Sequence, residues 1–183
     1  MTTQALLLID LQNDYFPDGA WPLVGIEAAS ANAVRLLAAY REAGHLVVHV
    51  RHESPAADAP FFRAGSLGAE LHASVLPAPG EPVILKHYPN AFRDTELRAV
   101  LDQHGVDSLV LAGAMSHMCI EAAGRAAADL GYATTVVHDA SATRDLAFEG
   151  RTVPAAQVHA AAMAALAFGY ARVIDTGSLL ADG

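Results

Sequence analysis

LVLAGAMSHMC, residues 109–119, runs from an apolar strand through a tight turn into a predicted helix. Its nearly continuous apolar start is typical of a strand that is covered on both faces, as in a parallel sheet. Cys119, the only cysteine, falls where the helix begins, and the positive end of a helix dipole favours a reactive thiolate. A free cysteine is also commonly a small buried hydrophobe, so its position alone leaves both interpretations open.

Similar apolar runs alternate with longer amphipathic stretches along the whole chain. The runs of strand length cover residues 5–9, 45–50, 82–85, 108–112, 133–137 and 171–174. The predicted helices cover residues 27–43, 94–104, 118–130 and 154–168. This alternation predicts the α/β class, with a three-layer α/β/α arrangement around a doubly wound, six-stranded, mainly parallel sheet. Residues 52–80 are rich in Pro, Ala and Gly and are expected to form an excursion over the sheet edge.

Length and composition predict a single domain, residues 1–183, with one large core. The formal net charge is -9, from 11 basic and 20 acidic residues, and Lys and Arg form no cluster that could neutralise phosphates. We therefore expect no nucleic-acid partner and no membrane partner, and a small molecule as the ligand. One cysteine cannot form an intramolecular disulfide, and no apolar stretch reaches membrane-spanning length, which together favour a cytoplasmic enzyme.

Chemically useful side chains follow three of the predicted strands. Asp10 ends the first strand, Lys86 follows the third, and Cys119 follows the turn after the fourth. Ligands of doubly wound sheets bind beyond the carboxyl ends of the strands, so an acid, a lysine and a thiol are expected at one rim. Taken singly, Asp10 could be a loop cap and Lys86 a solvated strand end. Their joint placement around one cysteine favours a functional site.

These three residue types suit acyl transfer. A thiol with an ordinary pKa of about 8.5 needs a base or a favourable field to act as a nucleophile near neutral pH. Asp10 is expected to take the thiol proton, and Lys86 to keep that carboxylate charged and to offset the thiolate. Backbone N–H groups between Met115 and Cys119 would stabilise an oxyanion. His117 lies two residues from Cys119 and so points elsewhere on a helix, which makes it a candidate pocket wall.

Several sequence blocks resemble the signatures of the isochorismatase-like cysteine hydrolases. They are LLIDLQNDYF at 7–16, KHYPNAF at 86–92, GAMSHMC at 113–119, AAADLGY at 126–132 and HDASATRD at 138–145. The resemblance implies the isochorismatase-like hydrolase fold and places the family's catalytic triad on Asp10, Lys86 and Cys119. It also implies a cis peptide bond between Ala114 and Met115, which would aim the Met115 and Cys119 amides at a carbonyl oxygen. A homodimer or larger homo-oligomer is implied as well.

Within that family, nicotinamidases hold a metal on an Asp-x-His segment after the second strand, with a further His downstream. This chain has VRHE at residues 50–53, which puts Arg51 where the acidic ligand would be. We therefore expect no metal and no other cofactor, although His49, His52 and Glu53 lie nearby in the sequence. Family members that cleave isochorismate lack the nucleophilic cysteine, so Cys119 points away from vinyl-ether hydrolysis and towards amides.

The functional prediction is a metal-independent cysteine hydrolase that cleaves a C–N bond of a small amide or carboxamide through a thioester on Cys119. The alternatives are an isochorismatase-type vinyl-ether hydrolase and a non-catalytic small-molecule binder on the same scaffold. The residues predicted to contact the substrate are Gln12, Phe16, His52, Tyr88, Asn90, His117 and Phe148. Other aromatic residues near the rim are not chosen, because such residues more often belong to the core; these are Trp21, Phe61, Phe62 and Phe92.

Overall fold

A six-stranded parallel sheet forms the centre of the computed structural model, which describes residues 3–182. The strand order is β3 (Val83–Lys86), β2 (Leu46–His52), β1 (Gln4–Ile9), β4 (Ser108–Ala114), β5 (Ala133–Ala142) and β8 (Arg172–Ile174). Every pairing in this sheet is parallel. The central strands β1 and β4 are buried almost throughout, which explains their continuous apolar sequences. The predicted six-stranded sheet is confirmed.

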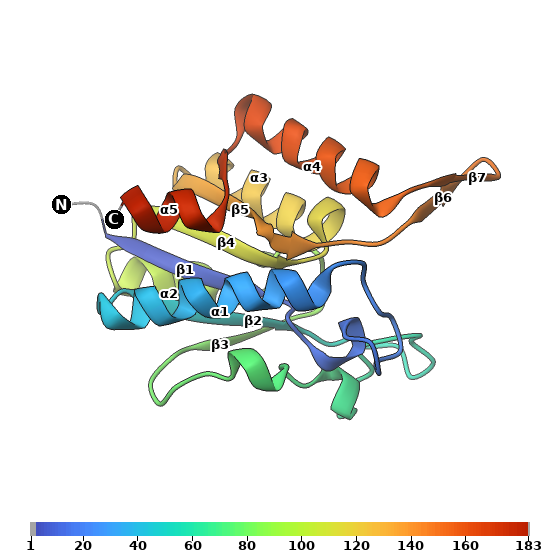
Figure 1. Ribbon diagram of the computed structural model, residues 1–183. Helices are drawn as coiled ribbons and strands as arrows, with labels where there is room; N and C mark the ends of the chain where they lie inside the picture. Colours follow the sequence, from blue (N-terminus) through green and yellow to red (C-terminus); the bar gives the residue numbers. More distant parts are fainter. Residues whose placement is uncertain (1–2, 183) are drawn as a thin grey trace.

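Helices cover both faces of this sheet and complete three layers (Figure 1). One face carries α1 (Ile26–Glu42) and α5 (Thr176–Asp182), and the other carries α2 (Leu97–Gln103), α3 (Glu121–Asp129) and α4 (Ala155–Gly169). Each face has its own apolar core, because alternate side chains of a strand point to opposite faces. The predicted three-layer, doubly wound arrangement is confirmed, although α5 lies outside the predicted helices. Within the described range, no helix is both long and apolar enough to cross a membrane.

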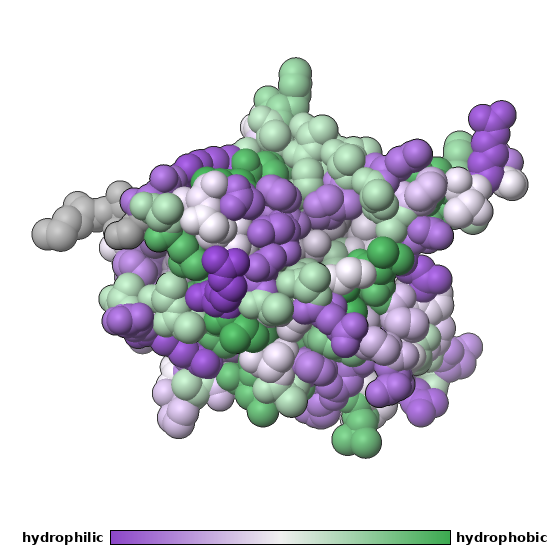
Figure 2. Space-filling view, in the orientation of Figure 1, coloured by the Kyte–Doolittle hydropathy of each residue, from purple (hydrophilic) through white to green (hydrophobic). Residues whose placement is uncertain are grey.

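A short antiparallel hairpin projects from the body of the molecule between β5 and α4 (Figure 1). It consists of β6 (Leu146–Phe148) and β7 (Arg151–Val153). Figure 2 shows it standing out from the surface, with hydrophilic residues at its tip. The sequence pattern does not predict this hairpin, because strands of three residues are too short to show a clear alternation. At its base, Asp145 Oδ1 accepts a hydrogen bond from Ala155 N at 2.7 Å and so caps α4.

The long segment between β2 and β3 lies at the edge of the sheet, as expected for an excursion. It contains two short helices, η2 (Leu67–Ala69) and η3 (Ala73–Val75). The buried carboxylate of Asp14, in the short helix η1 (Asn13–Tyr15), attaches this segment to the start of the chain. It accepts hydrogen bonds from Phe62 N at 2.6 Å and from Ala20 N at 3.1 Å. One buried acid therefore fixes two loops beside the carboxyl ends of the strands.

Gly113, near the end of β4, lets this strand approach β1 closely. Its φ is +129°, and a Cβ atom at this position would overlap the carbonyl oxygen of Ile9. Gly113→Ala is expected to lower the free energy of unfolding by roughly 3 kcal/mol or more, because steric overlap adds to backbone strain. Chemical denaturation measures this loss. In the control Gly169→Ala, a Cβ meets nothing within 4 Å, so we expect a change below about 1 kcal/mol. Equal stability of the two variants would contradict the close approach of β1 and β4.

Candidate active site

Asp10, Lys86 and Cys119 meet at the carboxyl edge of the sheet. Lys86 Nζ donates to Asp10 Oδ2 at 2.7 Å and to Cys119 Sγ at 3.3 Å. Asp10 and Lys86 are fully buried, and Cys119 is 6% exposed. The side chains come from the ends of β1 and β3 and from the turn after β4, so the parallel sheet brings them together. The expected convergence of an acid, a lysine and a thiol at one rim is therefore present in the fold.

The backbone holds Asp10 in a conformation that few non-glycine residues adopt. Its φ is +53°, in the left-handed region, and its N–H donates to Val50 O of β2 at 2.9 Å. Such conformations cost free energy and cluster at functional sites. The second carboxylate oxygen, Oδ1, is buried without a hydrogen-bond partner among residues 3–182. A buried acceptor of this kind is unfavourable unless a proton donor reaches it, so Oδ1 is the natural position for a base.

The third N–H of the Lys86 ammonium points to His52, whose Nδ1 lies 3.1 Å from Nζ. Burial alone would lower the pKa of Lys86, but Asp10 and Cys119 outweigh it, so the pKa is raised and the ammonium form persists. An ammonium group has only donors, so His52 Nδ1 accepts and the neutral ring carries its proton on Nε2. Burial and the charge of Lys86 lower the pKa of His52 to about 4. His52 therefore orients Lys86 through Nδ1, and its own N–H, on Nε2, lies beside the trio.

Burial and the charge of Asp10 raise the pKa of the Cys119 thiol above its ordinary value, and Lys86 opposes this only in part. This direction opposes the thiolate expected from the start of a helix, which stays a prediction. A thiol that keeps its proton needs a base at the moment of attack. Asp10, with its unpartnered Oδ1, is the group in position to act as that base.

Cys119 lies in a five-residue π-helical turn, η4 (Ser116–Ile120), which precedes α3. The carbonyl of Met115 accepts hydrogen bonds from Met118 N at 3.0 Å and from Ile120 N at 3.2 Å, the two amides that flank that of Cys119. Turns of this type interrupt the regular helical hydrogen bonds and occur frequently at functional sites. The peptide bond between Ala114 and Met115 is cis. Apolar periodicity, which predicts one helix over 118–130, gives no signal for this turn.

Four aromatic side chains form a wall beside the trio. The rings of Tyr15 and Phe62 are buried with centroids 4.5 Å apart, and Phe61 stacks on Trp21 at 4.9 Å. The wall reaches the trio through Phe62, whose ring centroid is 6.0 Å from that of His52. Trp21, Phe61 and Phe62 are not among the predicted substrate contacts, and Phe61 and Phe62 reach the site only through the folding of the excursion after β2.

Arg144 extends this aromatic wall. Its guanidinium carbon lies 4.0 Å from the centre of the Trp21 ring, and it forms no ion pair with another residue in the range 3–182. Burial raises the pKa of Tyr15, the charge of Asp10 raises it further, and Arg144 lowers it. The Tyr15 hydroxyl therefore lies within electrostatic range of both the Asp10 carboxylate and the guanidinium. In the same range, the buried Nε1 of Trp21 has no hydrogen-bond partner.

Gln12 and Asn90, two predicted substrate contacts, have structural roles in the single chain. The Gln12 side chain is fully buried; it donates to the carbonyl oxygens of His52 at 2.8 Å and Ala69 at 2.7 Å, and it accepts from His52 N at 2.8 Å. Asn90 Oδ1 accepts a hydrogen bond from Phe92 N at 2.9 Å and closes a turn. Nearby backbone groups already use the Gln12 amide and the Asn90 Oδ1. In the single chain these groups therefore hold loops in place, and their contact with a substrate stays a prediction.

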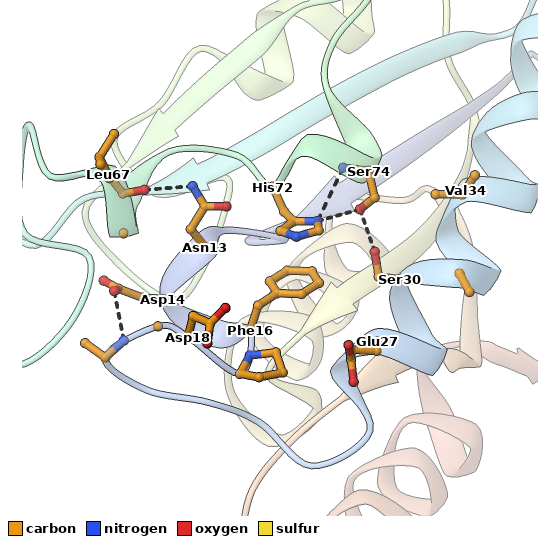
Figure 3. Close-up of a pocket in the computed structure, with 15 residues that line it drawn as sticks. Asn13, Asp14, Phe16, Asp18, Glu27, Ser30, Val34, Leu67, His72 and Ser74 are labelled. Atoms are coloured by element: carbon orange, nitrogen blue, oxygen red, sulfur yellow. Dashed lines mark hydrogen bonds between the residues drawn. The ribbon is translucent and has the colours of Figure 1, made fainter.

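Phe16 lies in a separate cavity of about 720 Å³, which Figure 3 shows. Its ring stacks on His72 with centroids 3.5 Å apart, and a hydrogen-bonded chain runs from His72 through Ser74 to Ser30. None of Asp10, Lys86 and Cys119 lines this cavity. In the single chain Phe16 is therefore not part of the aromatic wall beside Cys119, which contains the preceding residue, Tyr15. The contact of Phe16 with a substrate stays a prediction.

Tyr88 and Phe148 are surface residues in the single chain. Tyr88 is 37% exposed and lies under the guanidinium of Arg93, whose central carbon is 3.6 Å from the ring centre. Phe148 is 70% exposed on the projecting hairpin. Neither ring belongs to the aromatic wall, so these two predicted pocket contacts are not formed within one chain. The homo-oligomer implied by the family resemblance stays a prediction.

His117 faces away from Cys119 towards the base of the hairpin. Its Nδ1 lies 2.7 Å from Thr143 Oγ1, the residue before Arg144. His117 also lines a groove of about 560 Å³ between the hairpin and α4, together with Phe148. No member of the trio lines this groove, so the role of His117 as a wall of the substrate pocket stays a prediction. Its hydrogen bond joins the turn that carries Cys119 to the segment that carries Arg144.

The residues after β2 do not fit the metal site that nicotinamidases carry. Arg51 pairs with Glu53 and lies 3.6 Å from Glu70, while His52 Nδ1 accepts from Lys86. Across the described part of the chain, no group of three or more His, Cys, Asp and Glu side chains converges. The acidic and imidazole groups of this segment are therefore engaged with cationic side chains, and no step below uses a metal ion.

Known proteins similar to this chain point to one family. Residues 4–178 match the family model described as the isochorismatase domain. The chain is 48% identical over 178 residues to the uncharacterized isochorismatase family protein YddQ of Bacillus subtilis, which covers 97% of this chain and 99% of that protein. A crystal structure from Oleispira antarctica, described as an isochorismatase hydrolase, has a TM-score of 0.95 and 56% identity over 98% of this chain and 97% of that one. Maleamate amidohydrolase of Pseudomonas putida is 38% identical over 150 residues, 74% of this chain and 70% of that protein.

The lowered pKa of His52 predicts a pH dependence of stability. In the folded state the ring stays neutral down to about pH 4, whereas an unfolded histidine has a pKa of about 6.5. Between these values the unfolded state binds more protons, so the free energy of unfolding falls as the pH decreases through this window and levels off below it. His52→Asn removes the titrating group. Denaturation at a series of pH values should show a shallower fall for this variant, and parallel profiles would contradict the neutral, Lys86-bonded ring.

Proposed function

Because the chain belongs to the isochorismatase family of hydrolases, we propose that it is a cysteine amidohydrolase that cleaves a C–N bond of a small amide through a thioester on Cys119. The observation that carries this proposal is the buried ammonium of Lys86, which contacts both the Asp10 carboxylate and the Cys119 sulfur. The relationship to a maleamate amidohydrolase supports an amide as the substrate. The engaged residues after β2 support a reaction without a metal ion.

In the first half-reaction, Asp10 takes the thiol proton of Cys119 as the sulfur attacks the carbonyl carbon of the amide. Lys86 stabilises the negative charge that develops on the sulfur. The carbonyl oxygen becomes an oxyanion, and the N–H groups of Met115 and Cys119 are its proposed donors. When the tetrahedral intermediate collapses, the C–N bond breaks and Asp10 returns the proton to the nitrogen, which leaves as ammonia or an amine.

In the second half-reaction, a water molecule takes the place of the departed amine. Asp10 removes a proton from this water as its oxygen attacks the thioester carbonyl. The same amides stabilise the second oxyanion. Collapse breaks the C–S bond and the sulfur recovers a proton from Asp10, so the products are a carboxylic acid and the resting thiol.

Removing the nucleophile or the base is expected to stop this cycle. Cys119→Ala should reduce kcat for amide hydrolysis by at least about 10⁴-fold. Asp10→Asn should reduce it by about 10²- to 10⁴-fold, because it deletes general-base catalysis. Ammonia release from a panel of small amides after exhaustive chelation measures turnover, and intact-protein mass spectrometry detects the acyl adduct on Cys119. Asp129→Asn, on an exposed residue of α3, is the control.

Two results would overturn the thioester mechanism. One is near-normal turnover by Cys119→Ala. The other is cleavage of a vinyl ether such as isochorismate by a protein that yields neither product nor adduct with any amide. Loss of activity on chelation, together with release of a stoichiometric metal ion, would overturn only the metal-independent part of the proposal.

Arg144 supports a narrower substrate class. We propose that the amide substrate also carries a carboxylate, which accepts hydrogen bonds from this guanidinium and from Trp21 Nε1. A half-buried arginine without an ion pair in the described range, and a buried indole N–H without an acceptor, both lack an anionic partner. The flat wall of Phe61 and Trp21 favours a short, planar acyl group between that carboxylate and the amide. Maleamate, the substrate in the name of one relative, has both groups.

Arg144→Gln tests this assignment. For amides that carry a carboxylate, kcat/KM should fall by about 10- to 100-fold, as expected for the loss of a charge-assisted hydrogen bond. For the corresponding amides with a methyl ester in place of the carboxylate, kcat/KM should change little. Arg151→Gln removes the same charge from the exposed hairpin and serves as the control. Equal losses for both kinds of amide would contradict recognition of a carboxylate by Arg144.

A further inference from the structure

Ser116, the first residue of the π-helical turn, is fully buried and hydrogen-bonded to two other elements. Its Oγ donates to the carbonyl of Ala142, the last residue of β5, at 3.2 Å. The same Oγ lies 2.8 Å from Nδ1 of His159 in α4. A hydroxyl has one proton to donate. Because Ser116 donates it to the Ala142 carbonyl, its oxygen accepts the hydrogen bond from Nδ1–H of His159. The turn is therefore attached to the sheet and to α4 through one side chain.

His159 is held in place by the packing of α4. It shares a helix face with Met163 and Leu166, at spacings of four and seven residues, and both of these side chains are buried in the core. The start of α4 is fixed by the cap from Asp145 to Ala155 N. The imidazole thus presents its Nδ1 to the turn from a rigid helix rather than from a loop.

We propose that His159 is a positioning residue for hydrolysis: through Ser116 it holds the Met115–Cys119 turn in the geometry that stabilises the oxyanion. This inference rests on the proposed function, because the turn supplies the proposed oxyanion donors. Hydrogen-bond donors to an oxyanion are effective only when their positions are fixed before the reaction. A π-helical turn has few regular hydrogen bonds of its own, so outside anchors have to supply this rigidity.

The neighbouring His138 provides a matched comparison. It lies in β5, its ring centroid is 6.5 Å from that of His159, and both rings line a cavity of about 320 Å³ behind the turn. No hydrogen bond from the His138 side chain to another residue is formed within residues 3–182. His138→Asn therefore removes an imidazole from the same cavity and leaves the anchor of Ser116 intact.

The test compares His159→Ala, His159→Asn, Ser116→Ala and the His159→Ala/Ser116→Ala double variant. For the amide that the wild-type protein hydrolyses best, His159→Ala should lower kcat by about 10-fold or more, somewhat less than the loss of a whole oxyanion donor, with KM within about twofold. The aldehyde analogue of that amide, which forms a hemithioacetal on Cys119, should bind more weakly by a similar factor. Asn can place an N–H near the position of Nδ1, so His159→Asn should recover most of the loss.

The double variant separates positioning from a general loss of stability. If His159 acts through Ser116, adding His159→Ala to Ser116→Ala should lower kcat no further, because the effects of residues in one hydrogen-bonded chain are not additive. Ser116→Ala itself should lose at least as much as His159→Ala, because it also removes the bond to Ala142. Amide hydrogen exchange of residues 115–120 should become faster in His159→Ala and stay unchanged in His138→Asn. Additive losses, or unchanged kcat and unchanged exchange in His159→Ala, would overturn the inference.

Failure of the proposed function is distinguishable from failure of this inference. If the wild-type protein hydrolyses no amide and forms no hemithioacetal, the amidohydrolase proposal fails, and with it the role of the turn as an oxyanion hole. If the wild-type protein is active while His159→Ala matches it in kcat, in aldehyde binding and in exchange, the amidohydrolase proposal stands and His159 is not a positioning residue.

Discussion

A fully buried ion pair between Asp10 and Lys86 is the constraint on which the rest of this structure depends. Moving a charge out of water costs several kcal/mol per ion, and attraction compensates only when the geometry is close and the other donors are used. Lys86 satisfies this condition by donating to Asp10, His52 and Cys119 at once. For this to happen, the adjacent strands β3, β2 and β1 and the turn after β4 have to end side by side at the carboxyl edge of the sheet. The arrangement that solves the electrostatic problem is also the arrangement that brings a base to a thiol.

Sequence patterns predict the parts of the molecule that depend on local alternation. The continuous apolar runs predict the buried parallel strands, and the residues that follow these strands predict the trio, because a parallel sheet gathers its carboxyl ends at one edge. The hairpin β6–β7 and α5 are short, and α5 carries little apolar pattern, so the sequence gives no comparable signal for them. The sequence pattern also does not reveal the π-helical turn, because its residues, SHMCI at 116–120, have the composition of an ordinary helix start.

The lining of the site depends on contacts between distant segments, and sequence reasoning fails there. Gln12 and Asn90 are polar residues within recognisable motifs, yet backbone groups of loops bond the Gln12 amide and the Asn90 Oδ1. Phe61 and Phe62 reach the site because the carboxylate of Asp14 holds Phe62 N from more than forty residues away. Nothing in the pattern around residue 14 indicates that pairing. The positions of Asp10, Lys86 and Cys119 therefore follow from where the strands end. The aromatic wall instead depends on contacts between two loops that are distant in the sequence.

The resting protonation of Cys119 has a consequence for the durability of the protein. Peroxide attacks thiolates far faster than thiols, and oxidation of a cysteine follows both its ionised fraction and its exposure. A sulfur that is 6% exposed, with a pKa raised by burial, is a poor target for such oxidants. In the proposed mechanism, deprotonation by Asp10 accompanies attack on a bound carbonyl instead of preceding it. Under the proposed mechanism, the sulfur would therefore react slowly with oxidants between turnovers, and the same burial that raises its pKa would slow oxidative inactivation.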